Sequence, residues 1–374
     1  MVNLVRAKPA ARIGVRPIRR AAGAALSLLL VAGCGTDANG SAPTTGGGAD
    51  CVAGTFNGAG SSAQKPAVVA WTAAYQQQCA NVAFNYDAQG SNNGRTQFIE
   101  KQVPLAGSDA YLVEPQRGQA NQRCAPGTAI DLPMVITPIA VVYNLPGVDR
   151  LTLTPALVAK IFNGKVGRWN DPQLVAANPG VSLPDRSITP VHRSADSGTS
   201  ENLTRFLVAQ SPESWPYKAS QAWPNNFGLG ASVSTTMVGQ VKNTNGAIGY
   251  VDNPDAVKNT LTAAQIDTGF GPVKISPEAI AKVVDNTKVN QNGQDITLDL
   301  AYGTKIAGAY PVLLATYEIT CTQSLPADQA RFVKSFLTFT AGDGQDLLGG
   351  LGYIRLPKTL QSKVQAAVAQ LAGP

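Results

Sequence analysis

The sequence predicts an α/β protein with largely parallel sheets, and three observations support this prediction. Short apolar segments alternate with amphipathic stretches through nearly the whole chain, as strands joined by helices would. The 374 residues are enough for two or three domains, and 44% of them are hydrophobic, which suits a globular protein. Charged residues make up only 14%, which argues against a coiled coil and against an acidic disordered chain.

The expected strands are short apolar runs between turn-forming residues. In chain order they cover 51–56, 81–86, 132–143, 188–191, 247–251 and 310–317. The run over 132–143 is the longest, and Pro133 and Pro138 interrupt it. From Asp50 onward no apolar run reaches the length of about 18 residues that a membrane-spanning helix needs.

The expected helices are the amphipathic stretches between these runs. They cover 64–78, 95–101, 153–162, 200–209, 328–337 and 360–371. In the first of them Pro66 falls in the first turn, where the N–H that proline lacks would have no helical partner. Val68, Trp71 and Tyr75 recur along one face of the same stretch, which indicates a helix packed on a core.

Residues 1–33 have the three parts of a bacterial export signal. A basic segment precedes a largely apolar stretch over 21–32, and Val-Ala-Gly-Cys at 31–34 closes the leader. The apolar stretch is too short to cross about 30 Å of hydrocarbon as a helix, which favours a signal peptide over a membrane anchor. The closing residues resemble a lipobox, so we expect a lipoprotein signal peptide over 1–33 and lipid on Cys34. The alternative is a plain secretory signal with a chance cysteine.

Two further features follow from the leader. Residues 34–50 are rich in Gly, Ser and Thr, which predicts a flexible tether between the membrane and a folded body. The formal charge of +6 arises in the leader, because six of the 30 bases lie there without any acid. From residue 34 onward bases and acids are equal in number, so the net charge gives no support to a nucleic-acid partner.

Four cysteines remain after Cys34, and an even number in an exported chain favours two disulfides. Their wide spacing and the presence of only one histidine argue against a metal site. Four cysteines allow three pairings. We expect Cys51–Cys79, at one end of the first strand and helix, and Cys124–Cys321, beside two segments expected to run as neighbours.

Four loops of similar composition follow expected strands. They cover 57–63, 89–95, 106–109 and 192–200, and each is rich in small or hydroxyl-bearing residues. Such residues let backbone N–H groups crowd around a ligand, and the N-terminus of a following helix adds a positive dipole. Because these loops gather at the carboxyl ends of parallel strands, the sequence predicts a site for a small anion there.

The same loops carry a family resemblance. The motifs are GAGSSAQKP (58–66), YDAQGSNNG (86–94), AGSDA (106–110), IFNGKVGRWNDP (161–172), HRSADSGTSENLTRFL (192–207) and NGAIGYVD (245–252). In this order, over nearly the whole chain from Cys51, they resemble the phosphate-specific substrate-binding proteins of bacterial ABC transporters. The resemblance implies a two-domain periplasmic-binding-protein-like fold of type II, in which two α/β domains close over one dehydrated phosphate without a metal or other cofactor.

The resemblance also implies how the domains divide the chain. Each domain would be a mostly parallel sheet flanked by helices, and two crossing segments would form the hinge. We expect a discontinuous first domain over 51–138 and 313–374 and a second domain over 139–312.

The phosphate ligands follow from the same resemblance. Carried over position by position, they are Ser62, the backbone N–H of Ala63, Ser91, Asp109, Arg193, Ser197, the backbone N–H of Gly198, and Thr199. Arg193 would hold two oxygens of the anion with its planar guanidinium. Asp109 would accept a hydrogen bond from the proton that phosphate carries at neutral pH and sulfate lacks. The alternatives are a surface role for the arginine and helix N-capping by the aspartate and the hydroxyl residues.

Two positions depart from the family pattern. Many relatives have Thr-Phe where this chain has Ser62 and Ala63, a change that keeps one hydroxyl and one N–H. Relatives often place an acid two residues after the arginine, whereas here Ala195 fills that place and Asp196 follows it. The sequence therefore leaves open which acid orients the guanidinium of Arg193.

The expected function is capture of inorganic phosphate outside the cytoplasm by a monomer that the lipid on Cys34 anchors to the cell membrane. The partners would be the permease and ATPase subunits of an ABC transporter. Alternatives are a binder of sulfate, molybdate or another oxyanion, an exported phosphatase on a related fold, and a sensor or adhesin. A phosphatase would need a metal cluster or an activated nucleophile, and the only histidine, His192, is expected to pack at a strand end.

Overall fold

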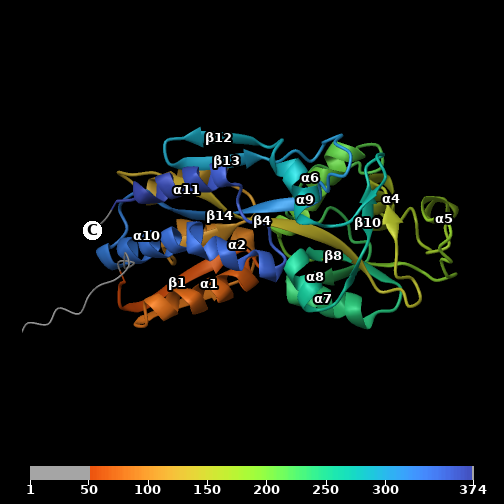
Figure 1. The fold of residues 1–374 in the computed structure, drawn as a ribbon, viewed down its shortest axis with the longest axis horizontal. Helices are drawn as coiled ribbons and strands as arrows, with labels where there is room; N and C mark the ends of the chain where they lie inside the picture. Colours follow the sequence, from red (N-terminus) through yellow and green to blue (C-terminus); the bar gives the residue numbers. More distant parts are fainter. Residues whose placement is uncertain (1–50, 373–374) are drawn as a thin grey trace, which may run out of the picture. The chain divides into compact units, whose positions relative to one another are not determined.

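The computed structural model describes residues 51–372, and these residues form an α/β fold around a nine-stranded mixed sheet (Figure 1). Along the sheet the strand order is β2-β1-β3-β14-β4-β8-β6-β7, and β9 pairs with β4. The strands are β1 (Gly54–Gly60), β2 (Val82–Asp87), β3 (Leu105–Ser108), β4 (Ala129–Tyr143), β6 (Thr189–Arg193), β7 (Leu229–Ala231), β8 (Ala247–Asp252), β9 (Thr262–Ala263) and β14 (Leu313–Cys321).

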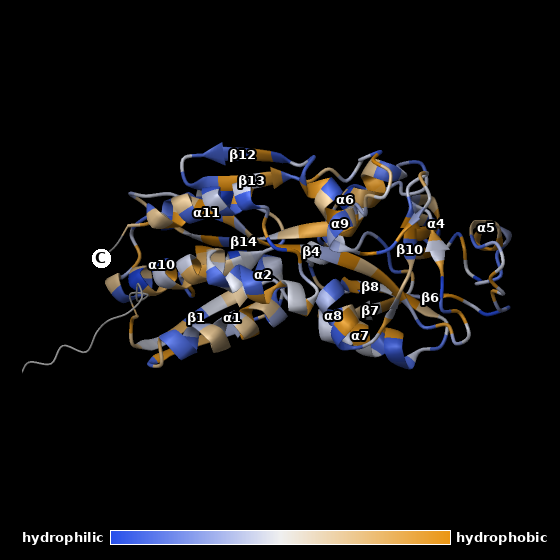
Figure 2. Cartoon of the chain, in the orientation of Figure 1, coloured by the Kyte–Doolittle hydropathy of each residue, from blue (hydrophilic) through white to orange (hydrophobic). Residues whose placement is uncertain are grey.

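The sheet has two parallel halves, joined by two antiparallel strands. The first half-sheet, β2-β1-β3, and the second half-sheet, β8-β6-β7, are each parallel throughout. Between them β14 and β4 run antiparallel to each other over nine residue pairs. All 15 residues of β4 are buried, and Figure 2 shows hydrophobic residues along this strand. The chain therefore passes between the two half-sheets along two strands whose residues are all buried.

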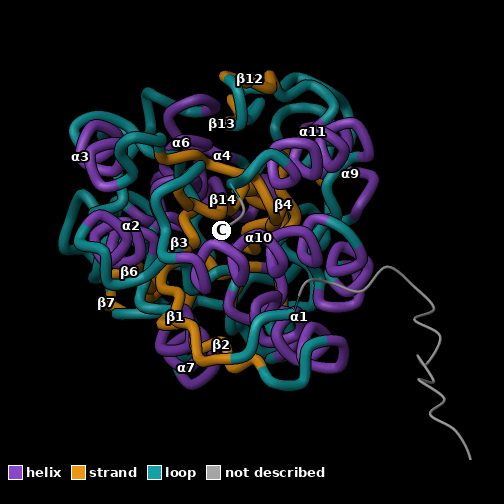
Figure 3. Tube along the Cα trace, turned by 90° about the vertical axis from the view of Figure 1, so that its left-hand side faces the viewer, coloured by secondary structure: helices purple, strands orange, loops and turns teal. Residues whose placement is uncertain are grey.

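Helices lie around the central strands β4 and β14, as the view in Figure 3 shows. They are α1 (Lys65–Gln78), α2 (Ser91–Ile99), α3 (Gln116–Arg123), α4 (Pro155–Phe162), α5 (Pro172–Ala177), α6 (Gly198–Gln210), α7 (Ser234–Asn243), α8 (Asn253–Lys258), α9 (Pro277–Val284), α10 (Ala327–Ala341) and α11 (Lys358–Ala369). Two short 3₁₀ segments, η1 (Asp343–Leu347) and η2 (Gly349–Leu351), follow α10. None of the helices described here is long and apolar enough to cross a membrane.

Two small sheets accompany the main one. One consists of β5 (Thr152–Leu153), β10 (Gln265–Asp267) and β11 (Pro272–Val273). The other is the hairpin of β12 (Lys288–Asn292) and β13 (Asp295–Asp299), which packs against β4. Asp295 holds the hairpin in place, because its carboxylate accepts a hydrogen bond from the backbone N–H of Asp131 at 2.7 Å and pairs with Arg117.

The predicted α/β alternation is confirmed, but the first two loops are shorter than expected. The strand β1 runs to Gly60, and α2 begins at Ser91, so parts of 57–63 and 89–95 belong to regular elements. The reason is tertiary: Gly58, Ala59 and Gly60 pair with β3. A Cβ on Gly94 would lie 2.4 Å from the Cα of Gly60, so this glycine lets α2 pack closely on β1.

Both predicted disulfides, Cys51–Cys79 and Cys124–Cys321, are confirmed. The first joins the segment before β1 to the end of α1. The second joins the end of α3 to the end of β14. The predicted signal peptide, the lipidated Cys34 and the tether over 34–50 lie outside the described residues.

Candidate functional site

The candidate site lies where strands of both half-sheets end. Ser61 and Ser62 follow β1, Asp109 follows β3, and Arg193 is the last residue of β6. Asp252 is the last residue of β8. Hydrogen bonds between these segments show that the loops of the two half-sheets are in contact. All the predicted ligands are buried. Those expected to bind through a side chain are each 9% exposed or less.

Arg193 is a buried cation held by neutral oxygens. Its Nε and Nη2 atoms donate to the backbone carbonyl of Ser232 at 3.2 and 2.8 Å. Its Nη1 atom donates to the hydroxyls of Ser197 at 3.0 Å and Ser62 at 3.4 Å. Burial lowers the pKa of the guanidinium, and Tyr250, Asp252 and Asp109 oppose that shift, but an arginine stays charged at neutral pH.

The open question of the acid that orients Arg193 has a geometric answer. Asp196 is exposed, and it accepts a hydrogen bond from Asn92 at 3.2 Å instead of contacting the guanidinium. Within residues 51–372 no carboxylate lies within salt-bridge distance of Arg193. The carbonyl of Ser232, just after β7, therefore orients the side chain where relatives often use an acid.

Asp109 lies among hydroxyls of the first half-sheet and β14. Its Oδ1 atom accepts from Thr316 at 2.7 Å and its Oδ2 atom from Ser91 at 3.1 Å, while its backbone N–H donates to Ser91. Burial raises the pKa of Asp109, and the hydroxyls of Ser61, Thr316 and Ser91 and the charge of Arg193 counteract part of that rise. The carboxylate is thus a buried acceptor close to the buried arginine.

The N-terminus of α6 approaches Asp109 closely. A Cβ on Gly198, the first residue of this helix, would lie 2.4 Å from the Cβ of Asp109 and 2.7 Å from the Ser91 hydroxyl. Ser197 caps the helix by accepting from the N–H of Ser200. The N–H groups of the first turn have no partners inside a helix, so those of Gly198 and Thr199 are suited to hold an anion.

The remaining predicted ligands join the same cluster, with two qualifications. The N–H of Ala63 donates to the hydroxyl of Ser61 at 3.0 Å, which occupies the donor that the resemblance assigned to a ligand. The Thr199 hydroxyl donates to Asp252 at 3.2 Å. His192, as expected, packs: its ring stacks on Trp223 with centroids 5.4 Å apart.

The sequence reasoning missed several residues of the cluster, among them Ser234 and Asp252. Ser234 lies 3.0 Å from Ser62, hydroxyl to hydroxyl, and Asp252 accepts from Thr199 and Ser234. Asp252 ends a parallel strand, so the rule that singled out the other loops would have found it. Ser234 follows β7, a strand of three residues that is too short to leave a pattern in the sequence.

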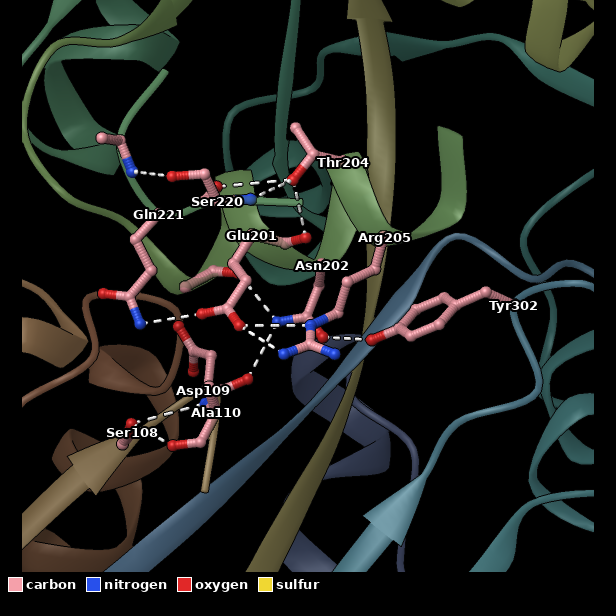
Figure 4. A network of polar contacts seen from close by, with 12 residues as sticks. Ser108, Asp109, Ala110, Glu201, Asn202, Thr204, Arg205, Ser220, Gln221 and Tyr302 are labelled. Atoms are coloured by element: carbon pink, nitrogen blue, oxygen red, sulfur yellow. Dashed lines mark hydrogen bonds and ion pairs between the residues drawn. The ribbon is translucent and has the colours of Figure 1, made fainter. Parts of the chain in front are cut away.

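A polar network extends from the cluster along α6 (Figure 4). Asn202 donates to the backbone carbonyl of Asp109 at 2.8 Å and accepts from Tyr302. Glu201 pairs with Arg205 and accepts from Gln221 at 2.8 Å. These residues and Asp109 line a cavity of about 210 Å³. The backbone at Asp109 is thereby fixed to the helix that carries Gly198 and Thr199.

The site contains no arrangement typical of metal catalysis. Across the described part of the chain, no three residues among His, Cys, Asp and Glu gather so that they could hold a metal ion. The groups that converge are one guanidinium, several hydroxyls, helix N–H groups and two carboxylates. Such a set can bind a tetrahedral oxyanion through many donors, and its carboxylates can accept a hydrogen bond from an oxyanion that carries a proton.

Comparison with known proteins gives a consistent result. The model of the PBP superfamily domain matches residues 45–343. Phosphate-binding protein PstS 2 of Mycobacterium tuberculosis is 38% identical over 362 residues, which cover 92% of this chain and 97% of that protein. Phosphate-binding protein PstS 3 of Mycobacterium leprae is 36% identical over 364 residues, covering 94% and 98%.

Solved structures agree on the fold. The subatomic-resolution structure of PfluDING, a high-affinity periplasmic phosphate-binding protein bound with phosphate at pH 8.5, aligns with a TM-score of 0.68. The alignment has 20% sequence identity and covers 83% of this chain and 93% of that one. At this identity the likeness concerns the fold, which is the two-domain periplasmic-binding-protein fold.

Proposed function

Because the chain belongs to the PBP superfamily and, within it, to the family of PstS phosphate-binding proteins, we propose that it captures inorganic phosphate between its two domains and delivers it to an ABC permease for import. The observation that carries the proposal is the buried guanidinium of Arg193, which faces hydroxyls of both half-sheets and has only neutral contacts. A charge in that position is suited to an anion that replaces water as its partner. The chain is a binding protein and not an enzyme.

The ligand set that we propose is the one carried over from the family. It consists of Ser62, the Ala63 N–H, Ser91, Asp109, Arg193, Ser197, the Gly198 N–H and Thr199. Two facts support it: all eight residues lie in one buried cluster, and they come from loops of both half-sheets. For Ala63 the N–H would have to exchange its bond to Ser61 for one to the ligand.

The proposed domains are 51–138 with 313–374, and 139–312. In support, Pro138 pairs with Leu313 in the β4–β14 ladder, so both crossings lie side by side. The hairpin β12–β13 is a special case. Its residue numbers fall within the proposed second domain, but it packs against β4, and the side chain of Gln294 in its turn donates to the carbonyl of Ala367 in α11. Closure would turn one domain against the other about the paired strands.

We place the protein at the extracytoplasmic face of the cell membrane, as a monomer anchored by lipid on Cys34. The leader pattern and the two disulfides support an exported chain. Mass spectrometry of protein extracted from membranes should find a diacylated N-terminal Cys34. A mature chain that begins elsewhere, with that cysteine missing or unmodified, would contradict the anchor.

Isothermal titration tests the function directly. Ligand-stripped protein is titrated with phosphate, and in parallel with sulfate, at one pH and one salt concentration. We expect tight binding of phosphate and much weaker binding of sulfate, because Asp109 offers an acceptor that only a protonated oxyanion can use. Equal affinities would favour a general oxyanion binder, and an absence of heat with either anion would refute the proposal.

A further inference from the structure

Hydroxyl groups from both half-sheets are hydrogen-bonded, directly or through one another, to one carboxylate that the family resemblance does not assign. Asp252 is 1% exposed, and its Oδ1 atom accepts from the Thr199 hydroxyl at 3.2 Å. Its Oδ2 atom is 3.5 Å from the hydroxyl of Ser234, which in turn lies 3.0 Å from that of Ser62. Asp252 is therefore hydrogen-bonded to Thr199 directly and lies at the end of a chain of hydrogen bonds that runs from Ser62 through Ser234.

An ionised Asp252 determines the direction of these bonds, because it can only accept. A guanidinium can only donate, so the oxygen of Ser62 accepts from Arg193 and its hydroxyl proton is free to point to Ser234. The proton of Ser234 then points to Asp252, which as a carboxylate can only accept. With Asp252 ionised, the donors Arg193, Ser62 and Ser234 therefore follow one another toward the carboxylate.

This orientation opposes anion binding. An anion in the cluster needs the hydroxyl protons of Thr199 and Ser62, yet an ionised Asp252 holds that of Thr199 directly and that of Ser62 through Ser234. An ionised carboxylate buried close to an anion also repels it. A protonated Asp252 would do neither, since its own O–H can donate and its remaining lone pairs compete less for the hydroxyls.

We propose that Asp252 takes up one proton as the anion binds, and that it thereby releases the hydroxyl of Thr199 and, through Ser234, that of Ser62 to donate to the ligand. The proton comes from solvent, and no covalent bond is made or broken. Asp252 then determines how many protons the protein takes up on binding, while Asp109 accepts a hydrogen bond from the proton that the ligand already carries. The inference rests on the proposed phosphate site.

The charged and titratable groups around Asp252 shift its pKa in both directions, and the effects that raise it are the larger ones. These groups are Arg193 on β6, Asp109 after β3, Tyr250 on β8, Asp255 on α8 and Tyr353 after η2. Burial raises the pKa of Asp252 well above its ordinary value, and the charges of Asp109 and Asp255 add to the rise. Arg193 and the Thr199 hydroxyl oppose it. An incoming anion adds a further negative charge, so the pKa of Asp252 rises again on binding.

The test counts protons. Phosphate is titrated into the protein calorimetrically at several pH values, each in two buffers of different ionisation enthalpy, and the same is done for Asp252→Asn. The asparagine cannot titrate, so we expect the variant to take up close to one proton fewer wherever Asp252 is ionised before binding. In that pH interval the wild-type affinity should fall about tenfold more per pH unit than that of the variant. Titration of phosphate itself contributes equally to both proteins.

Asp285→Asn is the matched control, because it removes an exposed carboxylate at the end of α9 that is not among the groups acting on Asp252. It should keep the wild-type proton count. Equal proton counts in wild type and Asp252→Asn would overturn the inference while leaving phosphate binding intact, whereas a wild type that binds no phosphate would refute the proposed function itself.

A measurement on the unaltered chain covers the case in which Asp252→Asn does not fold. Infrared difference spectroscopy should show a new carboxylic-acid C=O band when phosphate is added to the wild-type protein. Its absence at every pH used in the titrations would overturn the inference without any variant.

Discussion

At the scale of single residues, the site places one buried cation between two buried carboxylates without a direct ion pair. The guanidinium of Arg193 is held by the carbonyl of Ser232 and by two hydroxyls, so its charge is oriented but not neutralised by contact. Asp109 and Asp252 act on it only through their charge. A site built in this way attracts one anion, and its two carboxylates can still accept hydrogen bonds from protons in the site.

The first prediction concerns this cation. We expect Arg193→Ala to weaken phosphate binding by about 2 kcal/mol or more, roughly 30-fold, because a charge-assisted pair is lost. Isothermal titration measures the change. Arg168→Ala is the control, since Arg168 forms an exposed ion pair with Asp185 and should leave the affinity unchanged. A loss of the same size in both variants would argue for a nonspecific effect of charge.

The second prediction concerns discrimination between anions. Asp109→Asn keeps the shape of the side chain but gives it a donor that suits phosphate and sulfate alike. We expect the ratio of phosphate to sulfate affinity to narrow, as measured by titration with both anions at one pH and one salt concentration. Asp196→Asn, at an exposed acid near the site, should leave the ratio as it is. If Asp109→Asn leaves both affinities at wild-type values, the aspartate has only a structural role.

At the scale of elements, the N-terminus of α6 and the end of β3 determine how closely the two sides of the site meet. Gly198 begins α6 directly against Asp109 and Ser91, and Asn202, one turn later, donates to the Asp109 carbonyl. The helix and the loop after β3 are therefore in close contact and held together by a hydrogen bond. A single added methyl group at the contact would hold them apart.

The third prediction follows from that contact. We expect Gly198→Ala to fold but to bind phosphate at least about tenfold more weakly, because its Cβ would lie 2.6 Å from the Oδ2 atom of Asp109. The control is Gly239→Ala in α7, where nothing lies within 4 Å of the added Cβ. That variant should bind normally and unfold at a slightly higher temperature, because alanine is the better helix former. Normal affinity in Gly198→Ala would show that the contact opens during binding.

The fourth prediction concerns β14, the strand that carries Glu318 between β3 and β4. Burial raises the pKa of Glu318 from 4.5 to about 8, with a hydrogen bond from Gln64 opposing the rise. The folded state therefore keeps a proton that the unfolded chain loses above pH 4.5. The free energy of unfolding should fall as the pH rises toward 8, by at most about 1.4 kcal/mol per pH unit.

Urea unfolding at several pH values between about 5 and 8 checks this expectation against Glu318→Gln. The glutamine keeps the shape but binds no proton, so the stability of the variant should vary less with pH. Glu100→Gln, at an exposed glutamate, should behave as the wild type does. Identical pH profiles for Glu318→Gln and the wild type would show that the glutamate does not titrate in this range.

The sequence predicts an element when the pattern of residues within that segment is enough to define it. The long run that became β4 and the stripe of Val68, Trp71 and Tyr75 in α1 carry their own periodicity, and both were found. Strand β7 and the extension of β1 to Gly60 exist because neighbouring strands pair with them, and pairing leaves no pattern in a single segment. The β12–β13 hairpin had a local signal that went unnoticed: Gly293, at positive φ, opens the two-residue turn between the strands.

For the site, the loops that follow strands could be predicted and their internal bonding could not. Arg193, Asp109 and the serines stand out by residue type and position. The carbonyl of Ser232 that orients the arginine carries no signature, because every residue has one. Asp252 was detectable by its place at the end of β8, but a carboxylate is not an obvious choice for an anion site.

At the scale of the whole molecule, the two half-sheets are linked in two ways: by the paired strands β4 and β14 and by the contacts of the site. Beyond the cluster itself, Arg95 in α2 donates to Gln221 at 3.0 Å, and Asn253 in α8 donates to the carbonyl of Gly352 at 2.9 Å. The contacts made by side chains can break while the strands stay paired. Ligand binding that favours the closed arrangement should therefore stabilise the whole fold by mass action.

The disulfide Cys124–Cys321 turns everything between its two cysteines into a covalent ring, with a sequence separation of 197 residues. A protease that cuts once inside this ring releases no fragment, because both new ends stay attached through the sulfur bridge. Such nicked protein should run as one chain in a non-reducing denaturing gel and as two after reduction. A cut between Cys79 and Cys124 lies in neither disulfide loop, so it should divide the chain under both conditions. The ring also restricts the unfolded chain, which in the chain-entropy model stabilises the folded protein by about 5 kcal/mol, so mild reduction should lower the midpoint of urea unfolding.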